Sequence, residues 1–147
     1  MPNRKVHATV GAIAGFSSLV FTPPRCQTAS LAVPLGRTVG GLLGGCLPDL
    51  LEPASTPRHR EVCHSASAGS VAGLSLDTIR RLESCCLGQA KRFAAAASRE
   101  PDPWKQAVLV LASWAAEFIG SFLVGVAVGY ASHLVLDLFT PAGLPLI

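Results

Sequence analysis

The residues best suited to chemistry are four histidines, each at the end of an apolar segment or in a polar stretch between two segments. They are His7, His59, His64 and His133. His133 is followed four residues later by Asp137, and residues at this spacing share one face of a helix. An imidazole and a carboxylate side by side can bind a divalent metal ion. We therefore expect His133 and Asp137 to act as a pair.

The other candidate ligands are expected at the same end of the molecule. Asp49 directly follows an apolar segment, and His7 opens the segment before it. If these two segments run antiparallel, His7 and Asp49 lie at one end. The stretch that carries His59 and His64 follows Asp49 directly and belongs to that end as well. The pair in the last segment joins them if that segment runs in the same direction as the segment that ends at Asp49.

The ligand types restrict the metal. Six side chains form the predicted metal-binding set: His7, Asp49, His59, His64, His133 and Asp137. Nitrogen and carboxylate ligands without thiolate suit Zn²⁺, Mn²⁺ or Fe²⁺, and the five cysteines contain no C-x-x-C spacing. Six ligands exceed what one tetrahedral ion needs. One ion and a two-metal site therefore both remain open.

Several residues are candidates for direct roles in catalysis. The planar guanidinium of Arg60 suits an oxyanion, although a surface charge near lipid headgroups is the alternative interpretation. Glu52 and Glu61 are second-tier candidates for metal ligand or general base, and Asp49 belongs to the catalytic set as well as to the metal-binding set. This set is typical of an enzyme in which a metal ion activates water.

The composition indicates which classes of protein can hold such a site. The chain has 147 residues, enough for a single domain over 1–147. Half of the residues are apolar and only 14% are charged, against about 25% in a soluble domain. This excludes disorder. The net charge of +3 without a basic, aromatic stripe argues against nucleic-acid binding. A very apolar soluble bundle or a small membrane protein remains.

The apolar residues form three segments, separated by prolines and by polar stretches. The expected elements are apolar helices over 6–21, 30–47 and 104–139, a loop over 49–65 and an amphipathic helix over 76–97. Pro48 is expected to end the second segment. A spanning helix needs about 20 apolar residues, and residues 107–128 qualify. The predicted fold is all-α: a small helical membrane bundle of three to four apolar helices and one amphipathic helix.

Each apolar segment carries glycines four residues apart. The pairs are Gly11/Gly15, Gly36/Gly40, Gly41/Gly45 and Gly125/Gly129. Such pairs let helix backbones approach closely in lipid. They favour an integral membrane protein with membrane lipid as a partner, and they allow self-association of two copies through these faces. We expect a bacterial-type inner membrane as its location.

Two charges interrupt the apolar segments. Arg37 lies 12 residues before Asp49, and Glu117 lies 16 residues before His133. At 1.5 Å per residue their depths differ by only about 6 Å. A charge inside a membrane usually faces the bundle and finds a partner. We therefore predict an Arg37–Glu117 ion pair.

At these residues the chain resembles the YdjM-like family of membrane-bound metal-dependent hydrolases. The matching parts are His7, Pro48-Asp49 after a glycine-rich segment, the H-R-x-x-x-H-S block at 59–65 and the block from Gly129 to Pro145. The resemblance implies a helical membrane protein with a hydrolase-like metal site. One departure is that P-D-x-D-H-P of the family reads Pro48-Asp49-Leu50-Leu51-Glu52-Pro53 here.

The leading hypothesis is a membrane-bound hydrolase in which metal-activated water attacks a phosphoester or similar bond, with a lipid-like substrate. The altered Pro48–Pro53 motif leaves an alternative open, a non-catalytic scaffold or regulatory protein with a degenerate metal site. An ion transporter is a weaker hypothesis, because the candidate ligands lie at segment ends rather than in mid-membrane.

Overall fold

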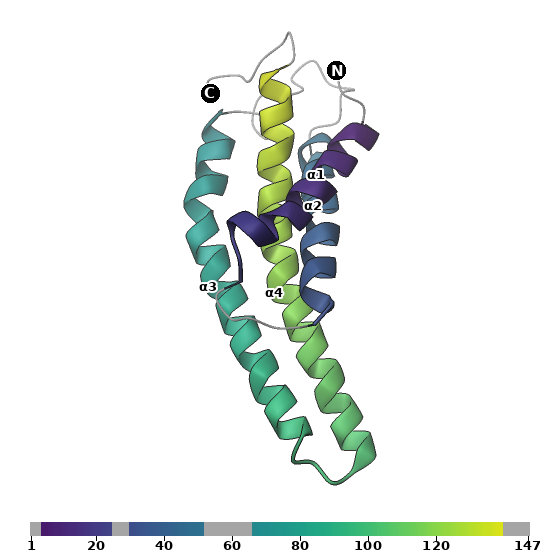
Figure 1. Cartoon of the computed structure of the whole chain (residues 1–147). Helices are drawn as coiled ribbons and strands as arrows, with labels where there is room; N and C mark the ends of the chain where they lie inside the picture. The colour runs from purple at the N-terminus through teal and green to yellow at the C-terminus, as the bar shows by residue number, and fades with distance from the viewer. Residues whose placement is uncertain (1–3, 25–29, 52–65, 140–147) are drawn as a thin grey trace.

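The computed structural model describes residues 4–24, 30–51 and 66–139, with the backbone alone for 66–75. These residues form four helices and no strand, which confirms the all-α prediction (Figure 1). In chain order the helices are α1 (Arg4–Phe21), α2 (Ala32–Leu51), α3 (Ala66–Ala97) and α4 (Pro103–Leu138).

The two long helices, α3 and α4, form an antiparallel hairpin that extends beyond α1 and α2 at one end of the molecule (Figure 1). The predicted break before the last segment is present. The Asp102 carboxylate accepts a hydrogen bond of 2.9 Å from the backbone N–H of Trp104, and Pro103 is the first residue of α4. An aspartate cap followed by proline is a strong helix start. The sequence therefore fixes where α4 begins.

Helices α1, α2 and α4 pack backbone against backbone through glycines. A Cβ on Gly41 would collide with the carbonyl oxygen of Gly11 in α1, and a Cβ on Gly129 in α4 would collide with the carbonyl oxygen of Gly41. Glycine is required wherever two backbones approach this closely. We call the contact the glycine interface; its members are Gly11, Gly15, Gly41, Gly45, Gly125 and Gly129.

The order of these contacts gives the helix directions. Gly15 lies against Arg37, and the earlier Gly11 lies against Gly41 and Gly45, so α1 and α2 are antiparallel as predicted. Gly125 lies against Arg37 and Gly129 against Gly41, so α2 and α4 are parallel. The start of α1 and the ends of α2 and α4 therefore meet at one end of the bundle.

The glycine interface joins three helices of the same chain. Its six glycines are all buried among α1, α2 and α4. The predicted close approach of helix backbones is therefore confirmed as an intramolecular contact. Association of two copies through such faces stays a prediction.

Two predicted boundaries are wrong. Helix α2 does not end at Pro48 but runs to Leu51, with Pro48 inside it. Proline lacks the N–H that would bond the carbonyl of Gly44, but only one bond is lost, and Pro48 is fully buried. The helix predicted over 76–97 begins earlier, because residues 66–75 form the start of α3. Local propensity is a weak constraint when tertiary packing opposes it.

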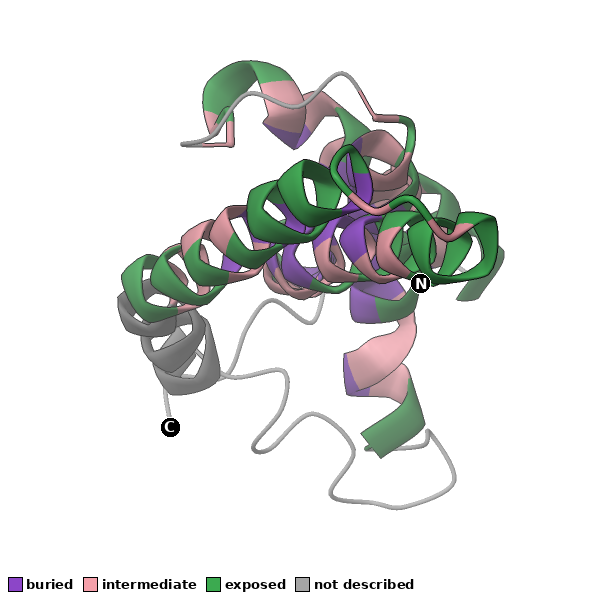
Figure 2. Cartoon of the chain, turned by 90° about the horizontal axis from the view of Figure 1, so that it is seen from below, coloured by how far each residue is buried: buried purple, intermediate pink, exposed green. Residues whose placement is uncertain are grey.

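The buried residues line the space between the helices, and the outer faces are exposed (Figure 2). The outer faces of α1, α2 and α4 carry large apolar side chains, such as Phe16, Leu43 and Leu111, at 49–67% exposure. Among the described helices α4 alone is long and apolar enough to cross a membrane. Helix α3 differs, because its exposed face carries the Asp77–Arg81 ion pair.

Candidate metal centre

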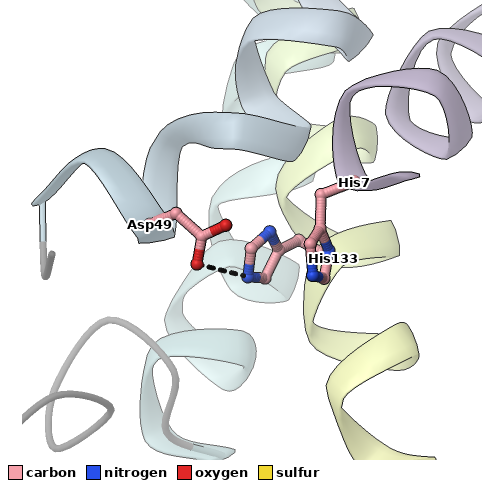
Figure 3. Close-up of side chains that lie close together, drawn as sticks. All are labelled: His7, Asp49 and His133. Atoms are coloured by element: carbon pink, nitrogen blue, oxygen red, sulfur yellow. Dashed lines mark ion pairs between the residues drawn. The ribbon is translucent and has the colours of Figure 1, made fainter. Parts of the chain in front are cut away.

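Three helices bring four of the predicted ligands together at one end of the bundle. His7 comes from the first turn of α1 and Asp49 from the last turn of α2, whereas His133 and Asp137 come from the last two turns of α4. Donor atoms of His7, Asp49 and His133 all lie within 4.8 Å of one another, close enough to bind one metal ion (Figure 3). Asp137 adjoins both histidines. We call these four residues the metal centre.

The glycine interface positions the α4 ligands. Gly129, His133 and Asp137 follow one another at intervals of four residues, and all three are buried. They therefore form one stripe along α4. Because Gly129 brings α4 into backbone contact with α2 at Gly41, the next residue of the stripe reaches α2 one turn further on. That residue is His133, and it contacts Gly45.

A backbone carbonyl fixes the tautomer of His133. The Nδ1 atom lies 2.6 Å from the carbonyl oxygen of Gly45. A carbonyl oxygen can only accept, so Nδ1 carries the hydrogen, and in the neutral ring Nε2 carries the lone pair. Nε2 lies 3.4 Å from Oδ2 of Asp137 and 3.7 Å from Oδ1 of Asp49. A metal-binding histidine characteristically donates its other N–H in this way.

The two imidazole rings are stacked. The ring centroids of His7 and His133 are 3.8 Å apart at an interplanar angle of 22°. Nε2 of His7 lies 3.9 Å from Oδ1 of Asp137, so each oxygen of that carboxylate faces one imidazole.

The separations between donor atoms fit a bound ion. At 3.4–3.9 Å they exceed hydrogen-bond lengths. Two ligand atoms bound at 2.0–2.2 Å to one tetrahedral ion lie about 3.4 Å apart. With neutral imidazoles the two carboxylates carry two negative charges, which one divalent cation would balance. The donor set is the nitrogen and carboxylate set that Zn²⁺, Mn²⁺ and Fe²⁺ accept.

The metal centre is buried except on one side. His7, His133 and Asp137 are 2%, 0% and 1% exposed, but the Asp49 side chain is 28% exposed. Water and substrate therefore have access along the Asp49 side, at the end of α2. A metal centre that hydrolyses a substrate needs such an open position.

The remaining predicted site residues cannot be placed. His59, His64, Arg60, Glu52 and Glu61 lie outside the described residues. The structure brings the other four predicted residues together at one end of the bundle. The carbonyl of Gly45 is a contributor that side-chain types alone could not indicate.

The predicted Arg37–Glu117 pair is wrong. Nη2 of Arg37 instead lies 2.8 Å from Oε1 of Glu83, and both residues are fully buried. Glu83 belongs to the segment that we predicted as an amphipathic helix over 76–97. It precedes the buried Leu87 by four residues, and this spacing on the inner face was the available signal.

Comparisons with known proteins do not identify a family for the chain. No family model, no curated protein and no solved structure matches the chain. The resemblance to the YdjM-like family therefore stays a prediction, and the functional argument depends on the metal centre itself.

Proposed function

We propose that the chain is a membrane-bound metal-dependent hydrolase whose ion is held by His7, Asp49 and His133, with Asp137 beside both imidazoles. The observation that carries the proposal is the set of donor separations, 3.4–3.9 Å, between two buried imidazoles and two carboxylates. Zn²⁺ is the proposed ion, and Mn²⁺ or Fe²⁺ fit the same donors. The resemblance to the YdjM-like family supports the same class of reaction.

Each residue has a distinct part in the proposed reaction. A divalent ion bound here supplies Lewis acidity, which makes water a nucleophile near neutral pH. Asp49 is the most exposed of the four and accepts the proton of the attacking water at the open side. Asp137 orients both imidazoles, as an outer carboxylate does in many metal sites. Arg60 and Glu52 are proposed to bind the anionic substrate and to assist as base.

The bilayer is the proposed location, as in a bacterial-type inner membrane. Helix α4 is the one described helix that is long and apolar enough to cross a bilayer. Helices α1 and α2, with 18 and 20 residues, would run beside it over about 27 and 30 Å. Their outer faces, like that of α4, are lined with exposed Leu, Ile, Val and Phe. The metal centre lies at the helix ends and so at the membrane surface. A phosphoester of a lipid-like substrate is within reach there.

Hydrolysis by the purified chain tests the proposal. The full chain in detergent, loaded with Zn²⁺ or Mn²⁺, should hydrolyse a chromogenic phosphodiester. The variants His133→Ala and Asp49→Asn should lose the activity, whereas Asp77→Asn, on the exposed face of α3, should keep it. Activity that survives in His133→Ala would contradict the proposal.

The altered Pro48–Pro53 motif favours one second candidate, a non-catalytic scaffold that retains a metal ion. In this case the wild-type chain binds metal through the same four residues but cleaves neither phosphoesters nor carboxylic esters. Metal binding without hydrolysis would therefore replace the first proposal by the second.

A further inference from the structure

A cavity of about 790 Å³ lies between the start of α2 and the first half of α4. The α3–α4 hairpin extends beyond this level of the bundle (Figure 1). The proposed hydrolysis does not use the cavity, which contains none of the metal-centre residues. We call it the apolar cavity; its walls include Leu31, Ala32, Leu35, Trp114, Ala115 and Phe118.

Small side chains create the apolar cavity beside a close contact of two helices. A Cβ on Gly36 would lie 2.6 Å from the carbonyl oxygen of Phe118, so α2 and α4 touch there. One turn earlier in α2 the lining residue is Ala32, and α4 contributes Ala115. Two methyl groups leave much of the space between the helices empty. The volume lies in the range of about 300–1,000 Å³ that is typical of ligand sites.

The lining favours an apolar occupant. Eight of the nine lining residues are hydrophobic, and none of the nine is charged. The exception is Ser30, whose hydroxyl oxygen accepts a hydrogen bond of 3.1 Å from the backbone N–H of Ala32. A polar ligand would lose its hydration here with almost no hydrogen bonds in return. A hydrocarbon chain has no such cost.

The apolar cavity opens on the outer surface that the proposed location places against lipid. Four of its lining residues are 54–77% exposed: Leu31, Leu35, Leu111 and Ile119. All the lining residues belong to α4, to α2 or to the two residues before α2. The exposed apolar faces of α2 and α4 therefore continue directly into the cavity, and lipid chains have access to it.

The apolar cavity and the metal centre lie near opposite membrane surfaces. Ala115 precedes His133 by 18 residues along α4, which is about 27 Å. Helix α4 is the candidate spanning helix, and a hydrocarbon core is about 30 Å thick. A lipid whose chain enters the cavity therefore comes from the leaflet opposite to the metal centre, and it is not the substrate of that centre.

A second copy of the chain fits the apolar cavity less well than a lipid does. The α4 part of the lining extends from Leu111 to Ile119, about 12 Å or two helical turns. A stable interface between proteins buries about 800 Å² on each partner, and two turns of one helix are too short for that. A single hydrocarbon chain needs no larger surface.

We propose that the apolar cavity binds one hydrocarbon chain of a membrane lipid from the leaflet opposite to the metal centre. The inference rests on the proposed membrane location but not on the proposed hydrolysis. The chain fills the space beside Ala32 and Ala115 and joins the start of α2 to α4. Because it exchanges one apolar environment for another, packing favours it rather than removal from water. We expect about a tenfold preference over the other lipid-facing surface.

Quenching of tryptophan fluorescence by a brominated phospholipid tests the site. The chain has two tryptophans, and only Trp114 lines the apolar cavity. The full chain with Trp104→Phe is purified in detergent and titrated with dibrominated phosphatidylcholine. The matched reporter replaces both tryptophans by phenylalanine and carries Leu43→Trp, because Leu43 is 49% exposed on the outer face of α2.

Trp114 should reach half-maximal quenching at a lipid-to-detergent ratio about tenfold lower than the Leu43→Trp reporter. Equal ratios would overturn the proposal and leave the membrane location intact. Quenching of neither reporter would overturn both the location and the proposal. A dimer in which Trp114 is not quenched would overturn the proposal in favour of a second copy.

Two variants locate the effect. In the Trp104→Phe background, Ala115→Phe fills the apolar cavity and should raise the half-maximal ratio for Trp114 to that of the Leu43→Trp reporter. Ala95→Phe, on the exposed face of α3, should leave the ratio unchanged. His133→Ala should also leave it unchanged, so a failure of hydrolysis and a failure of this proposal are distinguishable. An unchanged ratio in Ala115→Phe would overturn the assignment to the cavity.

Discussion

A second group of buried polar residues, the Arg37 cluster, consists of Arg37, Glu83, Glu117 and Ser121. The metal centre and the Arg37 cluster lie at two ends of one glycine interface, and they differ in which helices supply their residues. The α4 stripe at intervals of four residues joins them: Glu117, Ser121, Gly125, Gly129, His133 and Asp137 are all buried. The metal centre takes its ligands from α1, α2 and α4, which the glycines align directly. The Arg37 cluster also needs Glu83 of α3, which lies outside that interface.

The difference separates two uses of buried charge. In the metal centre each imidazole Nε2 lies 3.4–3.9 Å from a carboxylate oxygen, which fits ligands around an ion. In the Arg37 cluster a contact of 2.8 Å joins guanidinium and carboxylate directly. The metal centre is arranged so that it could hold a metal ion at the open end of the bundle. The Arg37 cluster contains a buried ion pair that joins α2 to α3.

The largest expected effect is in the Arg37 cluster. Glu83→Ala leaves a fully buried guanidinium without its carboxylate and should lower the free energy of unfolding by about 3–5 kcal/mol. Asp77→Ala removes an exposed ion pair and should cost less than about 1 kcal/mol. Denaturant unfolding in detergent measures both. Equal losses of unfolding free energy in the two variants would show that the buried Arg37–Glu83 pair stabilises the fold no more than an exposed ion pair does.

A smaller effect is expected in the glycine interface. In Gly41→Ala the new methyl meets the backbone of α1, and the helices must separate, which should cost about 1–3 kcal/mol. Because the same helices carry the ligands, metal affinity should fall as well. Gly88→Ala is the matched control: a Cβ there meets nothing within 4 Å. It should stabilise the chain by up to about 1 kcal/mol. A Gly41→Ala variant with wild-type stability and metal affinity would refute this role of the glycines.

The sequence predicts the metal centre better than the Arg37 cluster for a physical reason. The glycine pairs and the spacing of His133 and Asp137 are local patterns, and they indicate which faces meet. The sequence alone therefore predicts that four residues lie close together: His7, Asp49, His133 and Asp137. The partner of Arg37 could not, because the rotation of an amphipathic helix decides whether Glu83 points inward.

Two boundaries show where local rules fail. Pro48 is a helix breaker by chemistry, yet α2 continues to Leu51 and carries Asp49 into the metal centre. The small residues at the start of α3 have weak helix propensity and are nevertheless helical. In α2 the buried position of Pro48 between helices overrides local preference, and this packing is not readable from one segment alone.

Elemental analysis of the purified full chain tests the central claim most directly. After exposure to Zn²⁺ and removal of free metal, the wild-type chain should retain at least one equivalent of zinc. His133→Ala should retain far less, and Asp77→Asn as much as the wild type. A wild-type chain that retains no zinc, manganese or iron after loading would contradict the account. The four residues would then be a cluster of polar side chains and not a metal centre.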